Sequence, residues 1–178
     1  MSLREAVARG LIEVFGDDFD IESVRINILS KASMPLEITI DAGTVFEKAP
    51  SGKMIIKEMR IVTLPVHGNR QSINVNAADM GLCRCSDVDE SDKLTVSQSS
   101  PPAEIRKLLE LPEFREEDAR LQQFAIWTIT DNPTRNGYCK IDEGGIVTSI
   151  ELEGIERIRY IFEQAGISTK KYRALRKG

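Results

Sequence analysis

The chain has 178 residues, enough for one compact domain or two small ones. Its 24 basic and 28 acidic residues give a net charge of −4, which disfavours nucleic acid or an anionic membrane as the main partner. With 41% hydrophobic and 29% charged residues, the composition is that of a folded globular protein and excludes a fibrous or disordered chain.

The sequence contains no uninterrupted apolar segment of the roughly 20 residues that a membrane-spanning helix needs. Charged side chains interrupt residues 1–15, whereas a signal peptide has an uninterrupted apolar core. We therefore expect a cytoplasmic protein. The three cysteines, Cys83, Cys85 and Cys139, are too few and odd in number for a disulfide-stapled secreted scaffold.

The first part of the chain is predicted to be one helix followed by strands. Apolar residues at a spacing of four predict an amphipathic helix over residues 1–15 that ends at Gly16. Alternating apolar and polar residues then predict strands at residues 24–28, 36–40, 44–46, 54–64 and 72–77. Short strands joined by turns are typical of an antiparallel β-sandwich or barrel, here over about residues 20–80.

The character of the sequence changes after residue 80. A connecting loop rich in Ser, Asp and Pro covers residues 81–102. Two helices are predicted at residues 102–111 and 115–130. The second is apolar on most sides in its later half, which is typical of a buried helix. We expect it to pack against the β-rich part through Phe124 and Trp127.

The end of the chain is predicted to contain one more helix. It begins at Thr148, which forms a capping-box pattern with Glu151. The basic segment at residues 168–178 is predicted to fray. We therefore predict an α+β fold in a single domain, residues 1–178, with the helical part at about residues 102–178.

Gln123 is the most informative polar residue of the predicted central helix. It lies four residues before Trp127, so the two share a helix face among apolar side chains. Because a buried amide without a partner is unfavourable, we expect Gln123 to bind a backbone group of a neighbouring strand.

The segment Gln123-Phe-Ala-Ile-Trp127 resembles the Gln-x-Ala-Ile-Trp block of bacterial surface thioester domains. In that family a cysteine earlier in the chain condenses with the glutamine and releases ammonia, and the thioester then acylates a nucleophile on a partner surface. The resemblance implies that Gln123 is the acyl donor, that Cys83 or Cys85 supplies the thiol, and that Trp127 helps to exclude water.

Other signatures of catalysis or metal binding are weak. No glycine-rich phosphate loop opens a helix. The only histidine, His67, lies in a predicted turn, where we expect an exposed side chain. With Cys83, Cys85 and Cys139 it could supply four zinc ligands. Only one residue separates Cys83 from Cys85, which is a shorter spacing than structural zinc motifs have, so free thiols are expected.

We expect a non-catalytic module that binds another protein, without metal or cofactor, nucleic acid or membrane. The reason is that no residue constellation fits hydrolysis, phosphoryl transfer or redox chemistry. The first alternative is the thioester module. The second is a small hydrolase-like enzyme using residues near the end of the central helix, namely Asp131, Asn132, Arg135 and Cys139. The sequence does not specify the oligomeric state.

Overall fold

The computed structural model of the protein describes residues 1–19, 22–48, 52–81, 94–138, 140–142, 145–147 and 150–176. The chain forms two compact units. The first contains residues 1–78 and 85–101, and the second contains residues 79–84 and 102–178. The first unit is built mainly of antiparallel strands and the second mainly of helices, so the predicted α+β class is confirmed. The prediction of a single domain stays a prediction.

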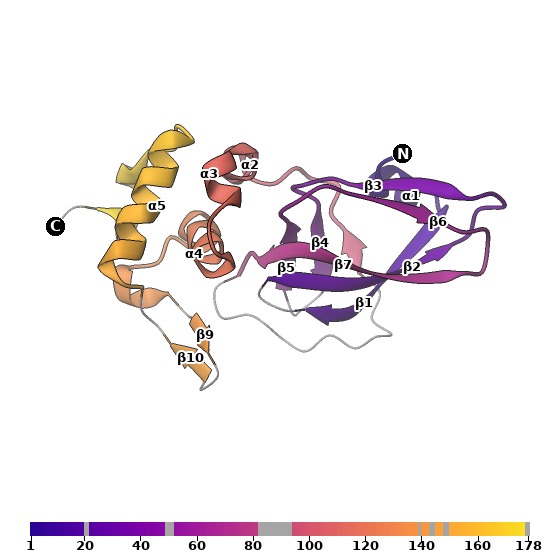
Figure 1. Ribbon diagram of the computed structural model, residues 1–178, viewed down its shortest axis with the longest axis horizontal. Helices are drawn as coiled ribbons and strands as arrows, with labels where there is room; N and C mark the ends of the chain where they lie inside the picture. The colour runs from indigo at the N-terminus through magenta and orange to yellow at the C-terminus, as the bar shows by residue number, and fades with distance from the viewer. Residues whose placement is uncertain are drawn as a thin grey trace. The chain divides into compact units, whose positions relative to one another are not determined.

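The first unit contains one short helix and eight strands among its described residues (Figure 1). They are α1 (Leu3–Ala8), β1 (Ile12–Phe19), β2 (Ser23–Ser30), β3 (Leu36–Ile40), β4 (Val45–Lys48), β5 (Gly52–Ile56), β6 (Arg60–Leu64), β7 (Arg70–Asp79) and β8 (Thr95–Val96). Six of the strands form one sheet in the order β1-β2-β7-β5-β4-β8, and β3 pairs with β6 in a separate two-stranded sheet.

The six-stranded sheet is nearly closed into a barrel. Its two edge strands are β1 and β8, and the backbone N–H of Leu94, beside β8, donates to the carbonyl of Val14 in β1 at 3.1 Å. Alternate residues of β2 supply the core, since Val24, Ile26 and Ile28 are all fully buried. The predicted sandwich or barrel is therefore confirmed.

The predicted helix over residues 1–15 is wrong beyond Ala8. The hydroxyl of Ser2 caps the helix by accepting from the N–H of Glu5 at 3.2 Å, and Gly10 ends it in the left-handed region with φ of +67°. The chain then enters β1, where Ile12 and Val14 alternate into the core. Their strand pairing outweighs the helical spacing of the apolar residues in this segment.

The strand predicted over residues 54–64 is two strands in different sheets. Pairing between β5 and β7 extends to Lys57, whose N–H donates to the carbonyl of Asn76 at 2.8 Å. The chain then leaves β7, and β6 pairs with β3 instead. Lys57 interrupts the apolar alternation at this point; its side chain is buried, and this burial lowers its pKa.

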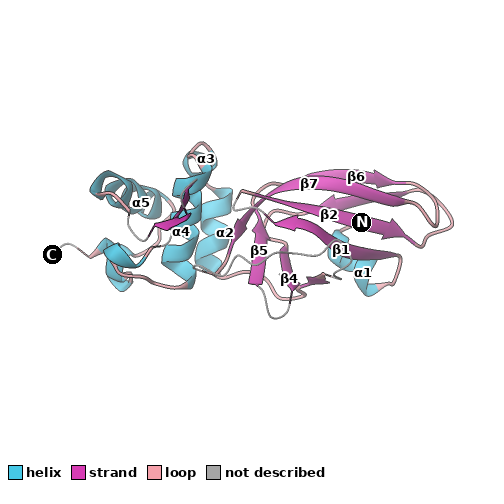
Figure 2. Ribbon diagram, turned by 90° about the horizontal axis from the view of Figure 1, so that it is seen from below, coloured by secondary structure: helices cyan, strands magenta, loops and turns pink. Residues whose placement is uncertain are grey.

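The second unit is mainly helical (Figure 2). Its elements are α2 (Ala103–Glu110), α3 (Pro112–Arg115), α4 (Ala119–Thr130), the 3₁₀ turn η1 (Arg135–Gly137), β9 (Lys140–Asp142), β10 (Gly145–Val147), α5 (Leu152–Gln164) and the 3₁₀ turns η2 (Thr169–Lys171) and η3 (Arg173–Leu175). A core of buried aromatic and aliphatic side chains holds them together.

Both later helices begin at other positions than predicted. The carboxylate of Asp118 caps α4 by accepting from the N–H of Leu121 at 2.9 Å, so the helix begins after Asp118 and is separate from α3. The N-cap of α5 is Glu151, which makes no side-chain cap bond. Thr148, the other half of the predicted capping box, lies outside the described residues.

Candidate functional site

Gln123 in α4 binds the backbone of Asp79 with both ends of its side-chain amide. Its Nε2 donates to the carbonyl of Asp79 at 2.6 Å, and its Oε1 accepts from the N–H of Asp79 at 2.9 Å. The side chain is fully buried, and Asp79 is the last residue of β7. The predicted backbone partner on a strand is therefore confirmed. The amide completes the pairing of a strand end as a neighbouring strand would.

Trp127 lies one turn after Gln123 and is also fully buried, as predicted. Its ring contacts Phe124 with a centroid separation of 5.8 Å, and Phe124 in turn contacts Tyr138 at 5.3 Å. The indole Nε1 of Trp127 has no hydrogen-bond acceptor in the part of the chain that the structure describes. The same turns of α4 therefore carry the buried Gln123 amide and a buried aromatic cluster.

The candidate thiols of a thioester, Cys83 and Cys85, lie outside the described residues, as does Cys139. The thioester and zinc interpretations therefore stay predictions. In the sequence, Cys83 follows Asp79 by four residues. Gln123 thus holds the backbone shortly before both candidate thiols. Loss of its Nε2 as ammonia would take away the donor to the Asp79 carbonyl.

Tyr138 closes a buried polar network beside the same aromatic cluster. The hydroxyl of Thr128 donates to the carbonyl of Phe124 at 2.7 Å and lies 2.6 Å from the hydroxyl of Tyr138, so the tyrosine is the donor of that pair. Burial raises the pKa of Tyr138 to about 12, while the hydrogen bond with Thr128 opposes the shift. The phenol therefore stays neutral and structural at physiological pH.

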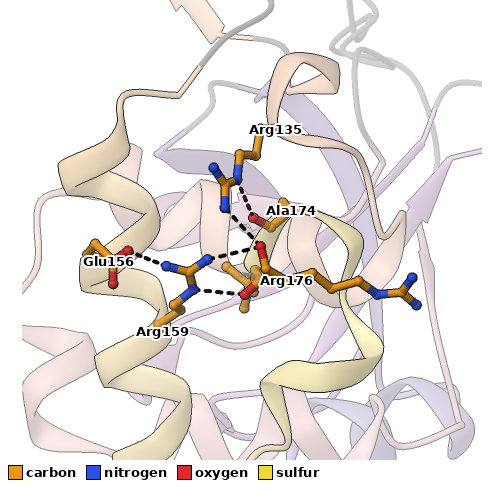
Figure 3. A network of polar contacts seen from close by, with 6 residues as sticks. Arg135, Glu156, Arg159, Ala174 and Arg176 are labelled. Atoms are coloured by element: carbon orange, nitrogen blue, oxygen red, sulfur yellow. Dashed lines mark hydrogen bonds and ion pairs between the residues drawn. The ribbon is translucent and has the colours of Figure 1, made fainter. Parts of the chain in front are cut away.

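Two residues of the hydrolase alternative, Asn132 and Arg135, bind the C-terminal segment. Asn132, with φ of +47°, accepts from the backbone N–H of Arg173 through its Oδ1 at 2.7 Å. Arg135 donates to the carbonyls of Ala174 and Arg176 at 3.3 and 2.8 Å (Figure 3). The carboxylate of Asp131 accepts from the neighbouring Thr130 hydroxyl at 2.6 Å. Cys139 is not described, and the contacts of Asn132 and Arg135 are those of a structural anchor.

Arg159 in α5 completes this anchor. Its side chain is buried, pairs with Glu156 and donates to the carbonyls of Leu175 and Arg176 at 2.8 and 3.2 Å (Figure 3). The predicted fraying of the segment is therefore wrong for residues 168–176. It is held by buried apolar side chains, including that of Leu175, and by two guanidinium groups that satisfy its carbonyls.

The described part of the chain contains no metal site, and His67 does not belong to one. His67 lies exposed in a turn, where its backbone N–H donates to the carbonyl of Ala32 at 2.7 Å. Within the described ranges, no three side chains of His, Cys, Asp or Glu lie close enough together to hold a metal ion. The helices of those ranges include none with the length and apolar character needed to cross a membrane.

A groove of about 680 Å³ lies between the beginnings of α4 and α5. Its lining combines apolar residues with five acidic and two basic side chains. The lining residues are Glu117, Asp118, Arg120, Leu121, Phe124, Ile150, Glu151, Glu153, Gly154, Glu156, Arg157 and Tyr160. The groove therefore carries a net formal charge of −3.

The two arginines of the groove are already engaged. Arg157 forms an ion pair with Glu117, which raises the pKa of the guanidinium, and it lies over the ring of Tyr160 at 5.0 Å. Arg120 lies over the ring of Phe124 at 5.6 Å.

Two carboxylates at the beginning of α5 are left for a ligand. Glu151 and Glu153 form no ion pair with any residue in the described ranges. The groove therefore presents negative charge that no described residue neutralises, together with apolar side chains. Sequence reasoning missed it because the two lining segments are about thirty residues apart; the acidic run Glu-Leu-Glu-Gly-Ile-Glu at residues 151–156 was its only signal.

The chain matches no protein-family model, no curated protein and no solved structure. Its function therefore has to be inferred from this geometry.

Proposed function

We propose that the chain is a non-catalytic protein-binding module whose groove between α4 and α5 receives a basic amphipathic helix of a partner protein. The observation that carries the proposal is the combination of a net charge of −3 with apolar side chains in one groove. Helix recognition in a groove uses this combination, with apolar anchors in the floor and charges of opposite sign along the rim.

The apolar and the acidic side chains have separate roles in this proposal. Leu121 on α4, Ile150 just before α5 and Tyr160 on α5 supply the apolar surface on which the partner side chains pack. Glu151 and Glu153 attract lysine or arginine side chains and set the orientation of the partner. Salt then weakens the complex, because these charges act through partly exposed pairs.

The experiment compares two labelled synthetic helical peptides of matched length by fluorescence anisotropy. One is built of leucine and lysine, and the other has glutamate in place of each lysine. We expect the basic peptide to bind and the acidic one not to bind. Reversal of both free charges, in Glu151→Lys with Glu153→Lys, should weaken binding by about tenfold or more.

A matched control separates the groove from the overall negative charge. Glu163 is exposed on the same helix and does not line the groove, so Glu163→Lys should leave the affinity nearly unchanged. Equal weakening by a reversal outside the groove, or no binding of the basic peptide, would contradict the proposal.

The thioester module remains the second candidate function. The observation in its favour is that the Gln123 amide is fully buried beside Trp127 and holds the backbone at Asp79, four residues before Cys83. In this reaction a cysteine sulfur bonds to the side-chain carbonyl carbon of Gln123. The bond from that carbon to Nε2 breaks, and the thiol proton leaves with the nitrogen as ammonia.

An intact-mass measurement tests this candidate. A thioester makes the chain lighter by one ammonia, and methylamine opens it with gain of the mass of methylamine. Neither change should occur in Gln123→Ala. A wild-type chain of unmodified mass, with Cys83 and Cys85 both titratable as free thiols, overturns the candidate and leaves the groove proposal untouched.

A further inference from the structure

Strands β6 and β7 follow each other in the chain, yet they do not pair. A short turn at residues 65–69 joins them, which is ordinarily the arrangement of a β-hairpin. Instead β6 pairs with β3 and β7 pairs with β2, so the strands belong to different sheets. Figure 1 shows the β3–β6 ribbon lying apart from β2 and β7.

The hydrogen bonds of β3 determine which backbone groups of β6 are free. Thr39 donates its N–H to the carbonyl of Met1, and the carbonyl of Glu37 accepts from the Met1 amine, so both face away from β6. In an antiparallel pair, two opposite residues direct their backbone N–H and C=O groups either both toward each other or both away from each other. Their partners Thr63 and Ile61 therefore direct their N–H and C=O groups away from β3.

The side of β7 that faces away from β2 pairs with β5 near its end, and Asn74 lies before that pairing. The carbonyl of Asn76 accepts from Lys57, so it points away from β2, and Asn74 shares this orientation two residues earlier. No backbone hydrogen bond joins Ile61, Thr63 or Asn74 to another segment within the described ranges. The free edge of β6 and Asn74 of β7 thus border one opening.

A hollow of about 390 Å³ lies in this opening. It is lined by four residues of β6 and four of β7: Arg60, Ile61, Val62, Thr63, Gln71, Ile73, Asn74 and Val75. Ile61 is 58% exposed although it is apolar. The Oε1 atom of Gln71 is buried and has no donor among the described residues, so the hollow contains an unsatisfied acceptor.

We propose that this hollow binds an extended segment of a partner protein, which adds as a strand to the free edge of β6. The free backbone groups of Ile61 and Thr63 pair with the segment, and Gln71 accepts one of its N–H groups. Arg60 is the only charged lining residue and forms no ion pair within the described ranges. The segment is therefore apolar at alternate positions and carries an acidic residue that meets Arg60. This site is separate from the groove of the helical unit.

The experiment selects ligands from a displayed library of random linear peptides on the full chain. The expected consensus alternates apolar residues and contains one Asp or Glu. A synthetic peptide of that consensus is then measured against Thr63→Pro, which removes one outward N–H and leaves the bonds between Val62 and Ile38 in place. We expect binding to fall by about tenfold.

Arg60 supplies variants that do not depend on the tolerance of a strand for proline, because its side chain is exposed. Arg60→Glu should weaken the peptide by about tenfold, and Arg60→Lys should retain most of the affinity. Binding should also slow hydrogen exchange at the amides of Ile61 and Thr63. Failure to enrich peptides, equal affinity for Arg60→Glu and wild type, or occupation of the edge by a second copy of the chain would each overturn the proposal.

Discussion

Replacement of Gln123 by methionine tests the bidentate contact with Asp79. Methionine has a similar length and no amide, so Gln123→Met leaves the buried N–H and C=O of Asp79 without these partners. Each unsatisfied buried group costs about 1–3 kcal/mol, and we therefore expect the free energy of unfolding to fall by about 4 kcal/mol. That is a large part of the stability of an ordinary domain.

Urea unfolding followed by fluorescence is suited to this measurement, because Trp127 is the only tryptophan and lies in the same helix. Gln164→Met is the matched control, since this glutamine is exposed at the end of α5. The control should change the stability by no more than about 0.5 kcal/mol. A loss below about 1 kcal/mol in Gln123→Met would refute the reasoning that the Asp79 backbone depends on this amide for its hydrogen bonds.

The variant Gln123→Glu adds a pH signature to the same contact. A carboxylate cannot donate to the carbonyl of Asp79, so only the protonated acid restores both hydrogen bonds, and burial raises the pKa of the new carboxyl. A raised pKa in the folded state means that stability is present below the unfolded value of about 4.3 and is lost as pH rises through the folded value. The gap to wild type should therefore widen from about pH 4 to neutral pH. A gap that is independent of pH would contradict this reasoning.

Three further measurements address other parts of the molecule. Because the pKa of Tyr138 is raised from 10.0 to about 12, stability should be lost as pH rises between these values, and Tyr138→Phe should lack the spectroscopic step near pH 12. Gly154→Ala should not raise the free energy of unfolding by the usual amount of about 1 kcal/mol, because the new Cβ would lie 2.9 Å from the side chain of Ile150. A full gain in thermal unfolding would show that the Ile150 side chain moves aside at little cost. In the free protein, the amide of Ile61 should exchange at least about tenfold faster than that of Val62, which pairs with β3, and equal rates would contradict the assigned free edge.

The fold class was predictable because periodicity reports local structure directly. The alternation at residues 24–28 and the apolar surround of Trp127 predicted a buried strand face and a buried helix, and both are confirmed. The partner of Gln123 was predictable as a class, since a buried amide needs a backbone group. Asp79 itself was not, because nothing local connects residues that are 44 positions apart.

The misplaced elements share one physical cause. Leu11 and Phe15 fit a helical spacing, and only the pairing of β1 with β2 decides that they belong to a strand. The segment predicted to fray is basic and short, yet it is held by Arg135 and Arg159 from elsewhere in the chain. Tertiary contacts of this kind, like the two walls of the groove, leave no periodic trace in the sequence.

The separation of β6 from β7 leaves a second pairing open to the free edge of β6. A hairpin closed across the turn at residues 65–69 would satisfy that edge within one chain, with little loss of entropy on closure. Among the described strands, β6 pairs only with β3, and this hairpin is left open. A substitution that lets β6 reach β7 should therefore close this hairpin, and the binding edge would disappear without unfolding of the protein.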